Sequence, residues 1–365
     1  MEPVRYNPAR SEDDERQDGS AMVGVGICGC GFMGRTHFQI FEDRPDTKVV
    51  ALMDADPRRR DGDWSQPLGN LPSRWPARLD MTGRTSHATV DSLLADGRVQ
   101  LVVVTLPTRL HADVSVTALR AGRHVLCEKP MALSFAECRR VIAAAEEAPG
   151  SYLCGLCIRF WPQYVTIKAL VDSGRFGKVR AVKLRRLASA PQYSHGGWLM
   201  DRTQSGGAIF DLHVHDVDFA LHLLGRPETV FARGQTGPSG GIDHVESLWT
   251  YDDDKVVSLE GGWCLPAGYP FEMSVQVRCQ EATLQWPAPP PADRGPVMLH
   301  RADGSSEALP VGAGNGWTGE IDYFLRCLAE NRRPALLTPR DSAEAIRLVE
   351  LELESIASGS AVPLA

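Results

Sequence analysis

A glycine-rich stretch near the beginning of the chain constrains its fold more than any other feature. The stretch reads GCGFMG at positions 29–34 and directly follows an apolar run, 22–28, that is typical of a buried strand. Because glycine permits a tight turn and a close approach of the backbone, this spacing predicts a turn that cradles a dinucleotide pyrophosphate before a helix. The residues expected to contact the dinucleotide here are Gly29, Gly31, Phe32 and Met33.

A carboxylate follows the second apolar run, about 20 residues farther along. Asp54 ends the segment VVALMDAD, where its side chain can accept hydrogen bonds from an adenosine ribose. The same charge repels a 2′-phosphate, so NAD is the expected cofactor. Three arginines follow at 58–60, and Arg58 is expected to contact the cofactor; since an arginine there can neutralise the acid, NADP remains possible. A solvated helix start is the simpler alternative for these arginines.

The hydrophobic pattern predicts an α/β fold class with two domains. Apolar runs and helical spacings alternate up to about residue 150, which favours a parallel Rossmann sheet. After it, alternating and β-branched segments separated by glycine, proline and aspartate favour an α+β domain with a mostly antiparallel sheet. The expected divisions are a disordered tail (1–20), the dinucleotide-binding domain (21–150), a substrate-binding and oligomerisation domain (151–340), and a C-terminal helix and tail (341–365).

Composition narrows the class of protein. The 365 residues carry 39 Lys and Arg against 46 Asp and Glu, a formal net charge of −7, which argues against a nucleic-acid partner. No apolar run approaches the roughly 20 residues of a membrane-spanning helix, and the first residues lack the apolar centre of a signal peptide. We therefore expect a cytoplasmic protein with no membrane partner. Cys154 and Cys157 form a lone CxxC, which we interpret as small core residues.

Two segments follow predicted strands and carry groups suited to chemistry. TLPTRLH at 105–111 and HVLCEKP at 124–130 are expected at the carboxyl edge of the sheet, where open α/β sheets bind ligands. The Lys129 ammonium can donate to a substrate oxygen and stabilise charge that develops there, although a salt bridge with Glu128 is an equally good reading. His111 is expected on the nicotinamide side, with a helix-start role as its alternative. The remaining predicted cofactor contacts from these segments are Thr105, Pro107 and Glu128.

Asp211 and His215 lie four residues apart in the segment FDLHVHDVD. On a helix they share one face, so a single hydroxyl can touch both side chains. A histidine is a suitable general base, and a neighbouring carboxylate can orient its ring. Helix capping by one of the aspartates is an alternative. We expect no metal, because His213 and His215 point to different sides of a regular helix.

These segments together resemble the Gfo/Idh/MocA family of NAD(P)-dependent oxidoreductases, which includes inositol dehydrogenases and glucose-fructose oxidoreductase. The motifs that carry the resemblance are GCGFMGRTH, TLPTRLH, AGRHVLCEKPMA, RFWPQY and GGAIFDLHVHDVD. The resemblance implies a Rossmann domain followed by an α/β domain whose open sheet forms homodimers or homotetramers. It places the catalytic centre on Lys129, Asp211 and His215. Two departures stand out. Four prolines between 57 and 76 would interrupt the usual helix, and His213 stands where relatives often have glycine, which leaves a contact to substrate or to a metal open for it.

The expected reaction is hydride transfer between NAD(P) and a secondary alcohol or ketone of a sugar, glycoside or cyclitol. His215 would take the hydroxyl proton, Asp211 would bind a hydroxyl and orient His215, and Lys129 would hold the reacting oxygen. Arg159 and Trp198 are further expected substrate contacts, with packing as the alternative for Trp198. Three other functions stay open: glycoside cleavage through transient oxidation without net redox, a biosynthetic ketosugar reductase, and a nucleotide sensor without turnover.

Overall fold

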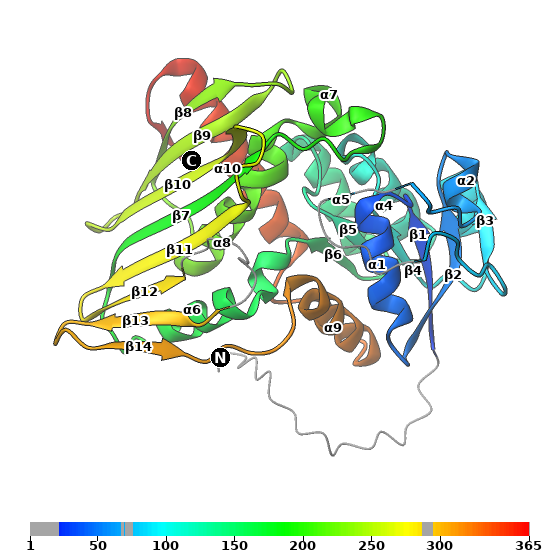
Figure 1. Ribbon diagram of the computed structural model, residues 1–365, viewed down its shortest axis with the longest axis horizontal. Helices are drawn as coiled ribbons and strands as arrows, with labels where there is room; N and C mark the ends of the chain where they lie inside the picture. The colour runs from blue at the N-terminus through cyan, green and yellow to red at the C-terminus, as the bar shows by residue number, and fades with distance from the viewer. Residues whose placement is uncertain (1–21, 67–68, 70–75, 287–294, 365) are drawn as a thin grey trace, which may run out of the picture.

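Two β-sheets with helices between and around them make up the protein (Figure 1). The computed structural model describes residues 22–66, 69, 76–286 and 295–364. The tail predicted at 1–20 lies outside these residues. The α/β class and the order of a parallel sheet followed by a mostly antiparallel sheet are confirmed.

The first sheet has the strand order β3-β2-β1-β4-β5-β6, and all its strand pairs are parallel. Its central strands are buried on both faces, which explains why they read as continuous apolar runs rather than as alternating patterns. The strands are β1 (Val23–Cys28), β2 (Thr47–Met53), β3 (Thr85–His87), β4 (Leu101–Val104), β5 (His124–Glu128) and β6 (Tyr152–Gly155). The helices of this part are α1 (Phe32–Glu42), α2 (Pro57–Arg60), α3 (Val90–Leu94), η1 (Thr108–Leu110), α4 (His111–Arg120) and α5 (Phe135–Glu147).

The second sheet has the order β14-β13-β12-β11-β7-β10-β9-β8-β15. Only β7 and β10 pair in parallel among these strands; the other pairs are antiparallel. Buried and exposed residues alternate along β9, so one face of the sheet packs on the core and the other faces solvent. The strands are β7 (Val179–Ser189), β8 (Thr229–Thr236), β9 (Ile242–Thr250), β10 (Val256–Leu265), β11 (Glu272–Cys279), β12 (Ala282–Trp286), β13 (Val297–Arg301), β14 (Ser306–Leu309) and β15 (Val362–Pro363).

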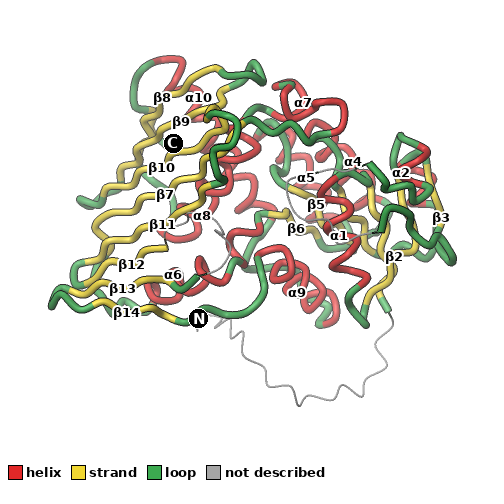
Figure 2. The backbone as a smooth tube through the Cα atoms, viewed as in Figure 1, coloured by secondary structure: helices red, strands yellow, loops and turns green. Residues whose placement is uncertain are grey.

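A layer of helices fills the space between the two sheets (Figure 2). The long helix α10 packs against β8, α8 and α5, and so joins both halves of the protein. The remaining helices are η2 (Cys157–Phe160), α6 (Pro162–Asp172), η3 (His195–Met200), α7 (Arg202–Ser205), η4 (Ile209–His213), α8 (Val214–Leu224), α9 (Gly316–Ala329) and α10 (Pro339–Ser358). Of the described helices, none has both the length and the apolar character needed to cross a bilayer.

The segment after β2 departs from a regular helix, as its prolines predict. Among the described residues of this segment, the one-turn helix α2 is the only helix, and the chain then folds back onto α1. Trp64 is buried and packs edge-on against Phe38, with ring centroids 4.9 Å apart. The buried guanidinium of Arg35 donates to the carbonyl oxygens of Trp64 (3.1 Å) and Gln66 (3.0 Å). Arg35 therefore fastens this segment to the helix that follows the glycine turn.

All nine cysteines are free thiols. Cys154 lies on β6 and Cys157 begins η2, and both are buried. Burial raises the pKa of both thiols well above the ordinary value. These two cysteines therefore behave as small core residues.

Candidate active site

The glycine turn leaves room for a phosphate group where the sequence predicts one. Gly29 has a φ of +104°, and a Cβ on Gly34 would stand 1.9 Å from the carbonyl oxygen of Gly29, so both positions require glycine. A Cβ on Gly31 would meet no atom within 4 Å. Since no side chain caps the first turn of α1, its amides face open space beside Gly31. This arrangement fits the pyrophosphate of a dinucleotide.

Asp54 is held in place at the end of β2, beside the glycine turn. Its Oδ2 accepts a hydrogen bond from the Cys30 amide (2.8 Å), and its Oδ1 accepts from Asp56 N–H (2.9 Å) and Arg59 Nη2 (2.8 Å). The arginine that meets the carboxylate is thus Arg59, whereas sequence reasoning selected Arg58. The Arg58 side chain is 61% exposed and pairs with Asp56 at 3.5 Å. Three consecutive arginines gave no signal to choose between them, because the choice depends on how the short α2 is rotated.

Residues that follow β4 contact the glycine turn and the segment around Lys129. The Thr105 hydroxyl lies 2.7 Å from the carbonyl oxygen of Gly29, to which it donates, so that it fixes the shape of the turn. Pro107 precedes the short helix η1, and His111 begins α4. The His111 ring is buried, with its two nitrogens close to the carbonyl oxygens of Leu106 and Pro130.

Lys129 joins the two halves of the protein. It follows β5 and precedes Pro130 through a cis peptide bond. Its Nζ donates to the carbonyl oxygen (2.6 Å) and to Oδ1 (2.9 Å) of Asp211, which lies in the π-helical turn η4. Both side chains remain slightly exposed, at 17% and 15%. The structure therefore brings together the two segments that sequence reasoning expected to meet.

His215 lies one turn beyond Asp211, in α8, and is 8% exposed. Burial, followed by the charges of Lys129 and Arg186, holds the pKa of His215 well below its ordinary value. The imidazole is thus neutral at physiological pH and able to accept a proton. In the part of the chain that the structure describes, Asp211 is bonded to Lys129 rather than to His215.

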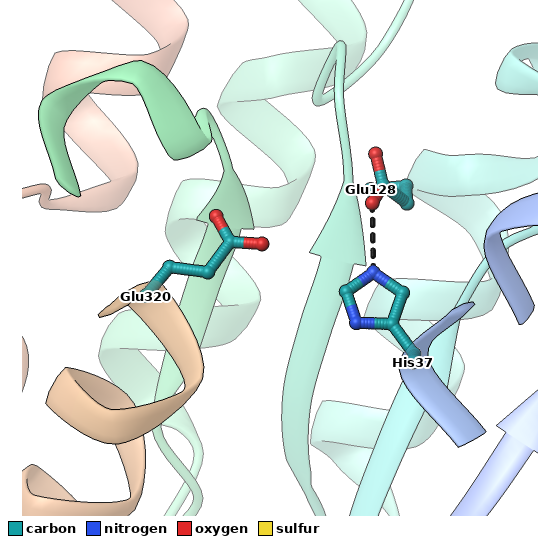
Figure 3. Close-up of side chains that lie close together, drawn as sticks. All are labelled: His37, Glu128 and Glu320. Atoms are coloured by element: carbon teal, nitrogen blue, oxygen red, sulfur yellow. Dashed lines mark hydrogen bonds and ion pairs between the residues drawn. The ribbon is translucent and has the colours of Figure 1, made fainter. Parts of the chain in front are cut away.

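His37, Glu128 and Glu320 form a buried cluster (Figure 3), and Glu128 directly precedes Lys129. His37 Nε2 bonds to Glu128 Oε1 at 2.7 Å, and Glu128 Oε2 accepts from the Lys129 amide at 3.2 Å. Burial opposes the ionisation of Glu128, but His37, Lys129 and His111 lower its pKa below the ordinary value. The Glu320 carboxyl points toward this pair from α9, and neither of its oxygens has a partner among the described residues.

Glu320 is neutral for two reasons. Burial, and then the charge of Glu128, raise its pKa well above the ordinary value. The three residues offer ligand atoms within 4.8 Å of one another, so in ligand type they suit a metal ion. Sequence reasoning missed this cluster, because Glu320 lies on α9, far along the chain from the other two residues. The only available signal was His37 in the GRTH motif.

Arg159 and Trp198 are the remaining predicted substrate contacts. The buried guanidinium of Arg159 bonds to both carboxylate oxygens of Asp218 (2.6–3.1 Å) and to the Leu336 carbonyl oxygen (2.8 Å). Its hydrogen-bonding groups are therefore engaged within the protein. Trp198 is half-buried in η3.

His213 faces away from the candidate site. Its Nε2 lies 3.0 Å from Glu352 Oε2 on α10, and both side chains are fully buried. The ring packs so closely on β10 that a Cβ on Gly261 would come within 2.7 Å of its Nδ1. His213 is thus part of the contact between η4, β10 and α10.

Tyr193 packs against Phe32 of the glycine turn, and sequence reasoning also missed it. Its ring meets Phe32 edge-on, with centroids 5.7 Å apart. Burial, and then the Asp211 charge, raise the pKa of its hydroxyl. No periodicity marks this residue, since it lies in the loop after β7.

Comparison with known proteins gives matches along most of the described chain. Residues 23–155 match the model of an oxidoreductase family with an NAD-binding Rossmann fold, and residues 164–285 match the GFO/IDH/MocA C-terminal domain. An inositol 2-dehydrogenase from Rhizobium meliloti is 24% identical over 358 residues, covering 94% of this chain and 99% of that protein.

Two further matches differ in how much they cover. An uncharacterized oxidoreductase from Streptococcus pneumoniae is 26% identical over 66% of this chain, which spans only 59% of that relative's length. Levoglucosan dehydrogenase, solved in complex with NADH and levoglucosan, has a TM-score of 0.78 with 20% identity, covering 93% of this chain and 99% of that chain. This structural likeness shows a shared fold.

Proposed function

Because the chain belongs to the GFO/IDH/MocA family of NAD-binding oxidoreductases, we propose that it transfers a hydride between the dinucleotide and a secondary alcohol or ketone of a sugar, glycoside or cyclitol. The names of its relatives support this substrate class, since one acts on inositol and one was solved with levoglucosan. When bound, the dinucleotide accepts or supplies the hydride. Every other step falls to residues of this chain.

One observation carries the proposal. A cation from the first sheet, Lys129, contacts Asp211 from the second half and acts electrostatically on His215 in the same segment. Lys129, a hydrogen-bond donor, thus contacts Asp211 one helical turn from His215, a neutral proton acceptor, and the neighbouring Glu128 is bonded to His37 on the helix that follows the glycine turn. This combination is what the oxidation of an alcohol requires.

Lys129 holds the reacting oxygen in this mechanism. Its ammonium donates to the hydroxyl or carbonyl oxygen and stabilises negative charge that develops there as the proton leaves. Asp211 accepts from the same ammonium, so it positions Lys129 and can also accept from a second substrate hydroxyl. This differs from the sequence-based expectation that Asp211 orients His215.

His215 moves the proton. In oxidation its neutral imidazole takes the hydroxyl proton, and in reduction the imidazolium returns it. The lowered pKa of His215 keeps the ring ready to accept a proton at physiological pH. Trp198 remains a proposed part of the substrate pocket.

The glycine turn and Asp54 hold the dinucleotide. The amides at the start of α1 bind the pyrophosphate, and Asp54 accepts from the adenosine ribose. Arg59 shields the Asp54 charge, so NADP is proposed as a second, weaker cofactor. A second copy of the chain is proposed to cover the open face of the second sheet, where Leu248 is 48% exposed.

The test is a screen of sugars, glycosides and cyclitols for reduction of NAD or NADP, followed by absorbance. Wild type is compared with Lys129→Ala and His215→Ala, and Lys168→Ala serves as a control, because Lys168 pairs with Asp172 on the surface of α6. We expect strong losses in the first two variants and none in the control. Unchanged turnover in both would contradict the mechanism, and substrate consumption without net reduced cofactor would instead indicate transient oxidation.

A further inference from the structure

The His111 ring has an unusual environment for a buried histidine. It is 1% exposed, and each ring nitrogen faces a main-chain carbonyl oxygen. Nδ1 lies 2.8 Å from the Pro130 oxygen, and Nε2 lies 2.7 Å from the Leu106 oxygen. The ring therefore connects the loop after β4 to the residue that follows Lys129.

These two contacts define the charge of the ring. A carbonyl oxygen can only accept a hydrogen bond, and a neutral imidazole has one N–H, so only the imidazolium can donate to both oxygens. In the neutral form, one nitrogen lone pair would face a carbonyl oxygen at hydrogen-bond distance, in a place closed to water. Burial lowers the pKa of His111. Cys127 and the two carbonyl oxygens together outweigh burial and raise this pKa to about 9.

The groups around His111 are consistent with a buried cation. The Cys127 thiol lies beside the ring on β5, and the Glu128 carboxylate at the end of β5 is the nearby anion, whose pKa the His111 charge helps to lower. Glu320 contributes no charge, since its pKa is raised. His37 is already bonded to Glu128.

The position of this cation matters for the dinucleotide. The adenosine end lies toward β2, where Asp54 stands, so the nicotinamide end extends toward the carboxyl ends of β4 and β5. Leu106 and Pro130, the two partners of His111, lie at those strand ends. An oxidised nicotinamide ring carries a positive charge and a reduced one does not.

We infer that His111 is a buried imidazolium that makes this site bind the reduced dinucleotide more tightly than the oxidised one. The inference rests on the proposed function, because it requires the nicotinamide to lie at these strand ends. It also assigns a direction: tighter binding of the reduced form shifts the bound couple toward the reduced dinucleotide, and so favours oxidation of an alcohol substrate. For two unit charges in one site at an effective dielectric constant of about 20, the preference is on the order of tenfold.

The experiment measures the dissociation constants of NAD and NADH from pH 7 to 10 by fluorescence or calorimetry. In wild type we expect the ratio Kd(NAD)/Kd(NADH) to fall about tenfold across this range, with a midpoint near pH 9, as the ring loses its proton. In His111→Gln the ratio should be low at pH 7 and independent of pH. His124→Gln is the matched control. His124 is the first residue of β5, at the end of the strand opposite Glu128, and its Nδ1 accepts a hydrogen bond from the Ser151 amide.

Two results would overturn the inference. One is a wild-type ratio that does not change with pH, which needs no variant and so holds even if His111→Gln does not fold. The other is a folded His111→Gln variant whose Kd(NAD)/Kd(NADH) ratio changes with pH as it does in wild type. That result would mean that another group titrates. Failure of wild type to bind either nucleotide would contradict the proposed function instead.

Discussion

The dinucleotide half of the site and its reaction half are built in different ways. The first is a continuous piece of backbone, in which Thr105 and Asp54 bond to the main chain of the glycine turn. The second is a set of ionisable side chains, most of them buried, that come from α1, α4, β5, α8 and α9. Each of these side chains affects the charge of its neighbours.

His111 and His215 show what the second kind of construction does. Both rings are buried, yet the pKa of His111 is raised to about 9 and that of His215 is well below its ordinary value. Carbonyl oxygens face the first ring, whereas the charges of Lys129 and Arg186 act on the second. The neighbours of a buried histidine, rather than burial alone, therefore decide its charge. We expect a substitution in the reaction half to alter the pKa values of neighbouring residues. A substitution in the dinucleotide half should affect only the contacts of the substituted residue.

The largest effect is expected for His215→Asn. Loss of the proton acceptor should lower kcat/KM by about 10²- to 10⁴-fold, since general-base catalysis contributes that much. The measurement is steady-state kinetics on a substrate found in the screen, with His124→Asn as a control. A His215→Asn enzyme as active as the control would show that the reaction half contains no essential base there.

Lys129→Met is expected to have the next largest effect and to reveal the coupling. Loss of the donor to the reacting oxygen should lower kcat by about 10²-fold or more. Because the Lys129 charge helps to lower the pKa of His215, its removal should also move the acid limb of the pH profile upward. An acid limb at the wild-type pH would mean that the two groups act independently.

Two neighbouring carboxyl groups should respond in opposite directions. The pKa of Glu320 is raised in the folded protein, so the stability linked to its proton is complete below the unfolded value and is lost as the pH rises toward the folded value. Glu320→Gln avoids this loss. Its advantage in the free energy of unfolding should grow as the pH rises from about 4.5 to about 7.5.

Glu128→Gln provides the contrast to Glu320→Gln. The pKa of Glu128 is lowered, so its ionised form stabilises the fold above the unfolded value, and this stability is lost as the pH falls. We expect this variant to be destabilised at pH 7.5, because His37 loses its partner. Urea unfolding measures the free energy of unfolding of both variants. Changes of the same sign in the two variants would contradict the charges assigned to Glu128 and Glu320.

The smallest effect is expected in the dinucleotide half. Arg59→Gln removes the cation on Asp54 and should weaken NADP binding about fivefold, on the order of 1 kcal/mol, with little effect on NAD. Arg58→Gln is the matched control, since Arg58 is largely exposed and pairs with Asp56. Equal effects of the two variants on NADP binding would show that Arg59 has no special place. If Arg59→Gln lost more activity than its weaker NADP binding explains, the dinucleotide half and the reaction half would not differ as described.

The same contrast explains what could be predicted from the sequence. The glycine spacing, the strand before it and Asp54 after β2 are local features, so they predicted the turn and its ligand class together. The two sheets followed from hydrophobic periodicity in the same way. The meeting of Lys129 with Asp211 was expected from a family resemblance, since the two residues lie far apart in the chain.

The remaining features depend on contacts between distant segments. Packing determines three of them: the side of α2 on which Arg59 lies, the neutral carboxyl of Glu320 and the charge of His111. No local sequence pattern indicates this packing. His213 was left open between substrate, metal and structure, and its bond to Glu352 on α10 lies well beyond the motif. Buried ionisable groups are thus the part of this site that the sequence could not describe.

The central claim is that Lys129 and His215 act on one oxygen beside the nicotinamide ring. A crystal structure with NADH and a substrate from the screen tests it most directly. We predict that the reacting oxygen lies within about 2.6–3.2 Å of both Lys129 Nζ and a His215 ring nitrogen. A nicotinamide ring bound elsewhere, or Lys129 and His215 facing separate cavities, would contradict the account.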